Sequence, residues 1–340
     1  MRGLGLVSYG VSTSLLAVGF MVSTSGRAQS VPSPSSTVLR LDNGLDALLE
    51  PDVKITRVAT GFQFVEGPMW REGRLWFSDL VGNRMYAVTP DGKVTLLIDH
   101  AGGLDHPAPG SFTGSNAMAT DNDGSVLMIQ HGLRRIVRLN RDLTVRPFLE
   151  RFEGKRFNSP NDLVFAKDGS LWFTDPPFGL AGLEKDPARE LHFSGVYRYA
   201  DGRLTAVMRD LTEPNGIGFS PDGKVIYISN SGPHKFVMRY SVGVNGTLTN
   251  GTMLISYPDD PKTNVPDGLK VDSVGNIWST GPGGIRILTP TGKVLGQIKL
   301  PETAANLAWA EDGKTLYITA SHSIYRLQTR IAGEMPVYRK

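Results

Sequence analysis

Six segments of the chain follow one template, and this repetition constrains the fold more than any other feature. Each segment opens on a polar residue, runs through a short apolar stretch, turns at a glycine about seven or eight positions later and returns as a second apolar stretch. A glycine turn between two alternating apolar stretches is a strong signal for a β-hairpin. The opening residues are Glu66, Asn116, Asn161, Asn215, Asp267 and Asn306, and the turn glycines are Gly73, Gly124, Gly169, Gly223, Gly275 and Gly313.

The spacing of these hairpins predicts the architecture. They recur about every 40–55 residues, which is the period of β-propeller blades, and each is followed by a further period-2 segment such as 84–88 or 195–199. We therefore predict an all-β fold over residues 40–340, a six-bladed β-propeller whose four-stranded antiparallel blades surround a central channel. A β-sandwich is the alternative, but it accounts poorly for a polar residue at the same place in six repeats.

The last repeat needs a strand from elsewhere in the chain. It runs out near Gln328, before a fourth strand. Residues 55–59 read as a strand and are expected to supply the missing one, which closes the ring and covers its free edges. Residues 42–50 are expected to form a short turn, because no long helical periodicity appears in the chain.

The N-terminus reads as a secretory signal. Arg2 provides a positive charge, residues 15–22 are apolar, and Ala28 ends a small-residue cleavage pattern. The sequence thus predicts a signal peptide at 1–28, a flexible linker at 29–39 and a secreted or periplasmic protein. An uncleaved membrane anchor is the alternative, although the apolar stretch is short for a bilayer.

Composition narrows the function classes. Hydrophobic residues make up 40% of the chain and charged residues 20%, as in a soluble globular protein. Without Arg2 and Arg27 the formal net charge falls from +3 to +1, so neither a nucleic acid nor a membrane surface is expected as a partner once the signal is cleaved. The chain has no cysteine, which excludes thiol catalysis and cysteine-bound zinc.

The six opening residues are the main candidates for function. The first strand of each propeller blade lines the central channel, so residues at equivalent positions are expected to form a ring of carboxylate and amide oxygens. Hard divalent cations prefer oxygen ligands, and two carboxylates balance a 2+ charge. Asn and Asp are also common turn residues, and each residue alone would be read as structural. Six in register favour a metal site.

The motifs around these residues resemble those of the regucalcin (senescence marker protein)–gluconolactonase family. The similar segments are Phe64-Val65-Glu66-Gly67-Pro68, Asn158-Ser159-Pro160-Asn161-Asp162-Leu163, Phe173-Thr174-Asp175-Pro176-Pro177-Phe178-Gly179, Glu213-Pro214-Asn215-Gly216-Ile217 and Pro266-Asp267-Gly268-Leu269. The resemblance spans residues 45–328. It implies a six-bladed propeller, one divalent ion at the channel mouth and hydrolysis of a lactone, usually a sugar lactone such as gluconolactone.

The resemblance also implies a set of ligands. It assigns Glu66, Asn215 and Asp267 to the metal, with Asn161 as a fourth ligand or a substrate contact. Ca²⁺ is the expected ion, and Zn²⁺, Mn²⁺, Mg²⁺ and Fe²⁺ are alternatives. Asp267 is the candidate catalytic base, because a ligating carboxylate has a second oxygen that can take a proton from water.

Other residues are candidates for substrate contacts or support. Asn116, at a ring position, is expected to contact substrate. His131 could contact substrate, shuttle protons or stabilise a turn, and Arg156 could bind a sugar hydroxyl or a developing anion. Asp175 is expected to hold its loop or support the ligands. Asn306 closes the ring and is expected to be structural.

Two other functions remain open at this stage. The same ion could serve a hydrolase of organophosphates or aryl esters, or the chain could be a binding propeller without catalysis. Substrate choice is expected to lie in the loops 101–115, 179–194 and 231–235. The sequence leaves the oligomeric state undetermined.

Overall fold

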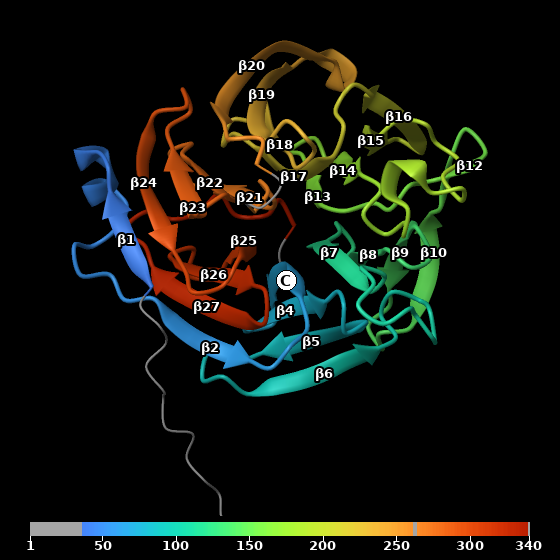
Figure 1. The fold of residues 1–340 in the computed structure, drawn as a ribbon, viewed down its shortest axis with the longest axis horizontal. Helices are drawn as coiled ribbons and strands as arrows, with labels where there is room; N and C mark the ends of the chain where they lie inside the picture. Colours follow the sequence, from blue (N-terminus) through green and yellow to red (C-terminus); the bar gives the residue numbers. More distant parts are fainter. Residues whose placement is uncertain (1–35, 261–263, 339–340) are drawn as a thin grey trace, which may run out of the picture. The chain divides into compact units, whose positions relative to one another are not determined.

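The strands form six antiparallel blades arranged in a ring around a central channel (Figure 1). The computed structural model describes residues 36–260 and 264–338. The predicted signal peptide at 1–28 and most of the predicted linker at 29–39 lie outside the described residues. The prediction of a six-bladed β-propeller is confirmed.

The first three blades follow one another along the chain. The bounds of their strands, from the channel outwards, are β3 (Val65–Arg71), β4 (Arg74–Asp79), β5 (Arg84–Val88) and β6 (Val94–Asp99); β7 (Ser115–Thr120), β8 (Val126–Gln130), β9 (Arg135–Leu139) and β10 (Val145–Leu149); and β13 (Leu163–Phe165), β14 (Leu171–Asp175), β15 (Gly195–Ala200) and β16 (Arg203–Met208). A small hairpin of β11 (Arg151–Phe152) and β12 (Lys155–Arg156) precedes the third blade.

The remaining blades complete the ring. Their strands are β17 (Pro214–Phe219), β18 (Val225–Asn230), β19 (Phe236–Val242) and β20 (Leu248–Ser256); β21 (Leu269–Val271), β22 (Ile277–Gly281), β23 (Gly284–Leu288) and β24 (Val294–Lys299); and β25 (Ala304–Trp309), β26 (Thr315–Ala320) and β27 (Ser323–Gln328). The described helices are short 3-10 turns: η1 (Asn43–Ala47), η2 (Leu183–Lys185) and η3 (Val244–Gly246). Within the described residues, none of the helices could cross a membrane.

The sixth blade is closed by the N-terminal part of the chain, as predicted. β2 (Thr56–Thr60) pairs antiparallel with β27, and Arg57 lies opposite Tyr325. Val58 and Phe62 then pack against buried residues of the first and sixth blades. The ring is therefore closed by a sheet that joins the two ends of the domain and gives β27 a partner on its outer edge.

The ordered fold begins earlier than the predicted boundary at residue 40. β1 (Thr37–Arg40) pairs with β24 as a fifth strand of its blade, so residues 37–39 of the predicted linker are in a strand. Val38 packs against the core of the last two blades, and Leu45 of η1 is fully buried there. These apolar contacts explain why the segment is part of the fold. The Ser- and Pro-rich composition of the predicted linker did not indicate that Val38 and Leu45 would pack against the core.

The hairpin turns agree with the template. The glycines predicted to make the turns all have positive φ, for example 82° at Gly169 and 72° at Gly223. This is the left-handed region that glycine adopts without steric cost. Cores form between neighbouring blades, where apolar residues of adjacent sheets pack face to face.

The channel ends in an apolar cavity on the side of the first strands away from the ring residues. Its volume is about 460 Å³, and its lining includes Met69, Met118, Phe165 and Trp309. Residues 334–338 border it: the Glu334 N–H donates to the Val271 carbonyl (2.8 Å), and the Phe165 and Tyr338 rings lie 5.0 Å apart. The C-terminal segment therefore crosses this end of the channel.

Candidate active site

The predicted ring residues all lie at the start of the first strands. Glu66, Asn116, Asn161, Asn215 and Asn306 are buried, with at most 6% of each residue exposed, and Asp267 is partly buried. Each is followed by the apolar residues that anchor its strand between two blades. The sequence template thus brings the six polar side chains to one end of one channel.

Backbone irregularities direct several of these side chains into the channel. The pairing register shifts at Glu66, Asn116, Asn215 and Asn306, where each first strand bulges away from its partner. Asn161 lies just before β13 and Asp267 just before β21. Bulges re-aim side chains and are common beside active sites. The irregularities account for polar side chains in strands whose other residues are apolar.

The glycine after a ring residue allows adjacent blades to approach. A Cβ at Gly67 would lie 2.1 Å from the Asn116 carbonyl oxygen, and one at Gly216 would lie 2.4 Å from the Asp267 carbonyl oxygen. Neither contact is sterically possible for another residue without movement of backbone. These glycines read as turn signals in the sequence, but their structural reason is close packing around the channel.

On one side of the ring the amides form a continuous relay. Asn116 Nδ2 donates to Asn161 Oδ1 (2.8 Å), and Asn161 Nδ2 donates to Asn215 Oδ1 (2.5 Å). Asn215 Nδ2 donates to the Ser231 hydroxyl (3.0 Å), which donates to the Pro266 carbonyl (2.5 Å) beside Asp267. The relay crosses the second to fifth blades and fixes each amide in one orientation.

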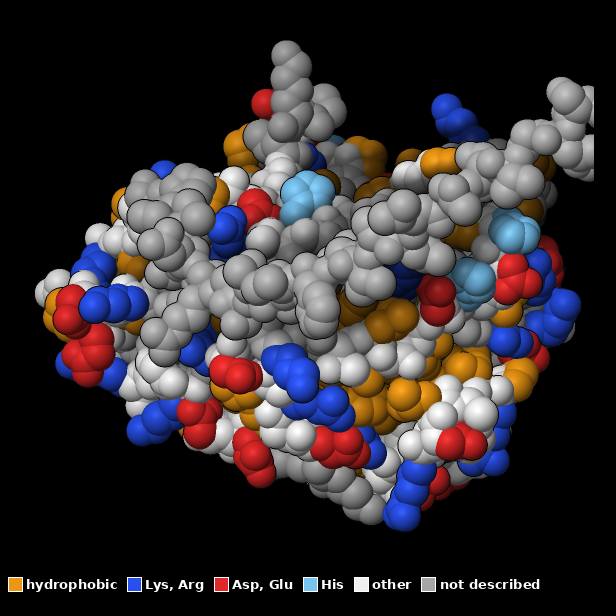
Figure 2. All heavy atoms as spheres, turned by 90° about the horizontal axis from the view of Figure 1, so that it is seen from below, with side chains coloured by type: hydrophobic (Ala, Val, Ile, Leu, Met, Phe, Trp, Pro, Cys, Tyr) orange, Lys and Arg blue, Asp and Glu red, His pale blue; other side chains and the backbone are white. Residues whose placement is uncertain are grey.

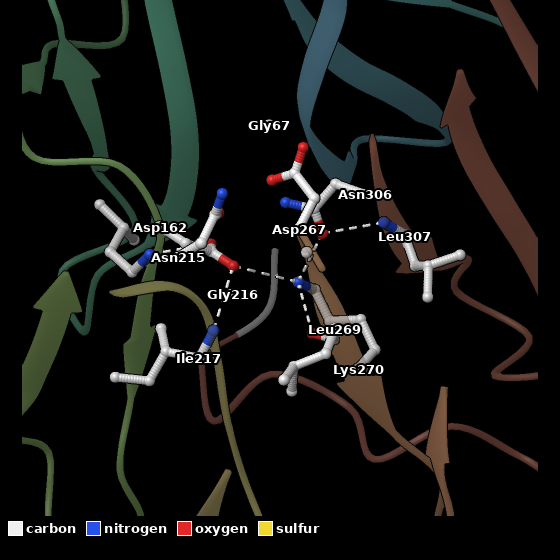
Figure 3. A network of polar contacts seen from close by, with 12 residues as sticks. Gly67, Asp162, Asn215, Gly216, Ile217, Asp267, Leu269, Lys270, Asn306 and Leu307 are labelled. Atoms are coloured by element: carbon white, nitrogen blue, oxygen red, sulfur yellow. Dashed lines mark hydrogen bonds and ion pairs between the residues drawn. The ribbon is translucent and has the colours of Figure 1, made fainter. Parts of the chain in front are cut away.

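On the other side the contacts support Glu66. Asn306 Nδ2 donates to Glu66 Oε2 (3.1 Å), and the Gly67 N–H donates to the same oxygen. Lys270 Nζ donates to Asn306 Oδ1 (3.0 Å) and lies 3.8 Å from Asp162 Oδ2, as Figure 3 shows. Asn306 was predicted to be structural, and its contact with Glu66 fits that role.

The carboxylates share a confined and negatively charged space. Burial raises the pKa of Glu66 to about 7, and the charge of Asp162 adds to the shift. Removal from water raises the pKa of Asp267 well above its ordinary range, with further contributions from Glu66 and then Asp162. The Glu66 and Asp267 carboxylates repel one another, so a divalent cation bound at the ring would be attracted to both.

His131 is held as a neutral imidazole next to Asn116. Its Nε2 lies 3.1 Å from Asn116 Nδ2, which can only donate, and its Nδ1 lies 3.1 Å from the Phe112 carbonyl, which can only accept. These two partners fix the tautomer with the proton on Nδ1. Burial lowers the pKa of His131 from 6.5 to about 4. The neutral imidazole of His131, at the edge of the circle of polar residues, can orient Asn116. It is not poised to donate a proton near pH 7.

The depressed pKa predicts a loss of stability in acid. The unfolded chain takes up the His131 proton below pH 6.5, and the folded chain does so only below about 4, so stability falls as the pH drops through this window. At pH 5 the loss relative to pH 7 is about 2 kcal/mol. In urea unfolding between pH 7 and 5, the unfolding free energy of His131→Gln should fall less with decreasing pH than that of the wild type. The control is His192→Gln, in an exposed loop, which should show the same pH dependence as the wild type. A wild-type pH dependence in His131→Gln would contradict this origin.

Asp175 and Arg156 lie beside the ring rather than in it. Asp175 is fully buried and accepts hydrogen bonds from the Asn158 and Ser159 N–H groups, at 2.9 and 2.8 Å, so it holds the loop that leads to Asn161. Burial raises its pKa to about 7. Arg156 donates to the Leu133 carbonyl (3.2 Å), and no hydrogen bond between described residues joins it to the ring. Its substrate contact stays a prediction.

Two charged residues of the site did not appear among the sequence candidates. Asp162 directly follows Asn161 and is buried, and Lys270 lies three residues after Asp267. Period-2 alternation from the ring residue Asp267 places Leu269, not Lys270, on the same side of the strand, so this pattern did not single out Lys270. The partners of the two side chains come from the tertiary structure.

The donor set differs from that of a carboxylate- or histidine-rich metal centre. Among the described residues, no group of three or more His, Cys, Asp or Glu side chains is arranged to hold a metal. The ring instead combines the Glu66 and Asp267 carboxylates with amide oxygens.

Figure 2 shows basic and acidic side chains intermingled on the face it presents, without a continuous patch of one sign.

Comparison with known proteins identifies the family. The family model described as "SMP-30/Gluconolactonase/LRE-like region" matches residues 64–322, most of the chain. The chain belongs to this family. The predicted resemblance is thereby confirmed, and the matched region contains all six ring residues.

Individual relatives agree with this assignment. A gluconolactonase from Zymomonas mobilis is 35% identical over 347 residues, covering 96% of this chain and 97% of that protein. The solved structure of a gluconolactonase from Xanthomonas campestris has a TM-score of 0.77 at 32% identity and covers 90% of this chain and 99% of its own. A calcium-binding regucalcin from Agrobacterium tumefaciens, at 18% identity and a TM-score of 0.61, shares the fold; it covers 83% of this chain and 95% of its own.

Proposed function

We propose that this member of the family is an exported, divalent-metal-dependent hydrolase of sugar lactones such as gluconolactone. The observation that carries the proposal is the convergence of the Glu66 and Asp267 carboxylates with the Asn161 and Asn215 amides at one mouth of the channel. The gluconolactonases similar over nearly the whole chain support the substrate class. Export is supported by the signal-like pattern of residues 1–28.

The residues at the ring fit a divalent cation. The Glu66 and Asp267 carboxylates lie at the ring, and the nearby buried carboxylate of Asp162 is paired with Lys270. Two negative charges are left over, which one divalent ion would balance. Glu66, Asn161, Asn215 and Asp267 are the proposed ligands, and hard oxygen donors of this kind suit Ca²⁺ first, with Mn²⁺, Mg²⁺, Zn²⁺ or Fe²⁺ as alternatives.

The chain's own groups can carry the rest of the reaction. A divalent ion in this site supplies Lewis-acid polarisation of the lactone carbonyl and a lowered pKa of water. We assign Asp267 as the base that removes a proton from the attacking water as its oxygen bonds to the carbonyl carbon. The ring C–O bond then breaks and the ring oxygen takes up a proton, which gives the hydroxy acid. Asn116 and Arg156 are proposed to bind substrate hydroxyls.

Metal removal tests this function. Dialysis of the mature protein against a chelator should abolish hydrolysis of glucono-δ-lactone, followed by proton release in weak buffer, and added Ca²⁺ or Mn²⁺ should restore it. Full activity after chelation, with the metal content checked by mass spectrometry, would contradict metal dependence.

A substrate panel separates the competing functions. Hydrolysis of sugar lactones at rates well above those of paraoxon or phenyl acetate supports the lactonase assignment. A preference for the phosphotriester or aryl ester would favour the esterase alternative. A folded protein that binds a divalent ion but hydrolyses none of these compounds would favour a binding propeller.

A further inference from the structure

We propose that Lys270 is a positioning residue, which orients the Asn306 amide so that Asn306 binds one oxygen of Glu66 and leaves the other for the ion. The inference rests on the proposed function, because it concerns the geometry of the proposed metal ligand. It assigns a role to a side chain beneath the ring that is neither a proposed ligand nor a proposed substrate contact.

Lys270 lies where it can act on the support of Glu66. It projects from β21, and its Nζ donates to the Leu269 carbonyl and to Asn306 Oδ1, both at 3.0 Å. Asp162 Oδ2 lies 3.8 Å away on the opposite side, and Figure 3 shows the ammonium between these two partners. The side chain of Asp162 is only 5% exposed, and its charge is compensated by Lys270 together with the Leu163 and Ile217 N–H groups, which donate to it at 2.9 and 3.4 Å.

Donor and acceptor chemistry fixes which way the Asn306 side-chain amide is turned. An ammonium group can only donate, so the Asn306 oxygen must face Lys270. The Leu307 N–H donates to the same oxygen at 2.9 Å and favours the same orientation. The Asn306 amide nitrogen is then turned to Glu66, where it donates to Oε2 at 3.1 Å.

This orientation determines which oxygen of Glu66 is offered to the ion. Oε2 accepts from both the Asn306 amide and the Gly67 N–H, which uses its two lone pairs. Oε1 accepts none of the hydrogen bonds described. Supporting contacts of this kind orient metal ligands, and their loss typically weakens metal binding by about 10–100-fold.

The charge of Lys270 has the opposite effect to its positioning, and this allows a decisive test. A positive charge near the site repels a cation, so a role limited to charge means that removing Lys270 tightens ion binding. A role in orienting Asn306 and Glu66 means that removing it weakens binding. The sign of the change therefore distinguishes the two roles.

The test is calorimetric titration of metal-stripped mature protein with Ca²⁺. Lys270→Met should raise the Kd by about 10-fold, while a Kd that is unchanged or lower would overturn the inference. Lys167→Met is the matched control, because Lys167 and Lys270 both line the apolar cavity. Lys167 contacts the Pro221 carbonyl and lies 3.6 Å from Glu334 Oε1 instead of contacting the ring. The Kd of Lys167→Met for Ca²⁺ should therefore stay within about twofold of the wild-type value. Lys270→Gln, one atom shorter, provides a second variant with the same expected loss if the methionine variant does not fold.

A double-mutant cycle tests the route through Asn306. Asn306→Leu keeps the size of the side chain and removes its donor, so it should also weaken Ca²⁺ binding. Lys270→Met in that background should weaken binding no further, because its target is already absent, and any remaining change should be the tightening expected from loss of a positive charge. Additive losses would overturn the route. A wild-type protein that binds no Ca²⁺, Mn²⁺ or Zn²⁺ would defeat the proposed metal function itself, whereas normal wild-type binding with an unaffected Lys270→Met variant defeats only this inference.

Discussion

Asparagine in place of Asp267 is expected to lower kcat for lactone hydrolysis by about 10³-fold, within the range for loss of a general acid or base. Asparagine keeps one oxygen for the ion but cannot accept a proton from water at neutral pH. The effect should persist at saturating metal, since it is due to the missing base rather than to an empty site. Steady-state kinetics at several Ca²⁺ concentrations measure it.

The control for this variant is Asp259→Asn. Asp259 is an exposed acid of the neighbouring loop that pairs with His234 (2.8 Å) and has no described contact with the ring. It should keep wild-type kcat, and both variants should keep a wild-type circular dichroism spectrum. Wild-type kcat in Asp267→Asn at saturating metal would remove Asp267 from the role of base.

Glutamine in place of Glu66 is expected to weaken binding of the divalent ion by more than about 100-fold, beyond the usual effect of a supporting residue. The reason is the pair of N–H donors on Oε2, from Gly67 and Asn306. Glutamine has one oxygen. If that oxygen stays with the two donors, the amide NH₂ faces the ion, and if it turns to the ion, two N–H groups face an NH₂. Calorimetric titration with Ca²⁺ measures the loss.

Glu72→Gln is the matched control for Glu66. Glu72 follows β3 in the same blade, and its half-exposed side chain pairs with Arg71 and Arg74 instead of facing the ring. Its Kd for Ca²⁺ should equal that of the wild type. A Glu66→Gln variant that binds Ca²⁺ as tightly as the control would exclude Glu66 as a ligand.

Much of the fold followed from local sequence because the signals for it are local. A glycine turn between alternating strands needs only about ten neighbouring residues to be recognised, and it recurs six times. The closing strand at 56–60 was predictable because the sixth repeat lacked its outer strand. The start of the fold at Thr37 was not, since its order depends on contacts with β24, far along the chain.

The sequence by itself determined the six blades, the ring of polar residues from Glu66 to Asn306 and the family. Only the tertiary structure decided which atoms of that ring face one another. The relay from Asn116 through Asn161 to Asn215 and the link from Lys270 through Asn306 to Glu66 join residues of different blades, 36 to 240 positions apart. Periodicity reports which face of a strand a residue occupies, whereas the direction of a hydrogen bond depends on the partner that another blade brings to it.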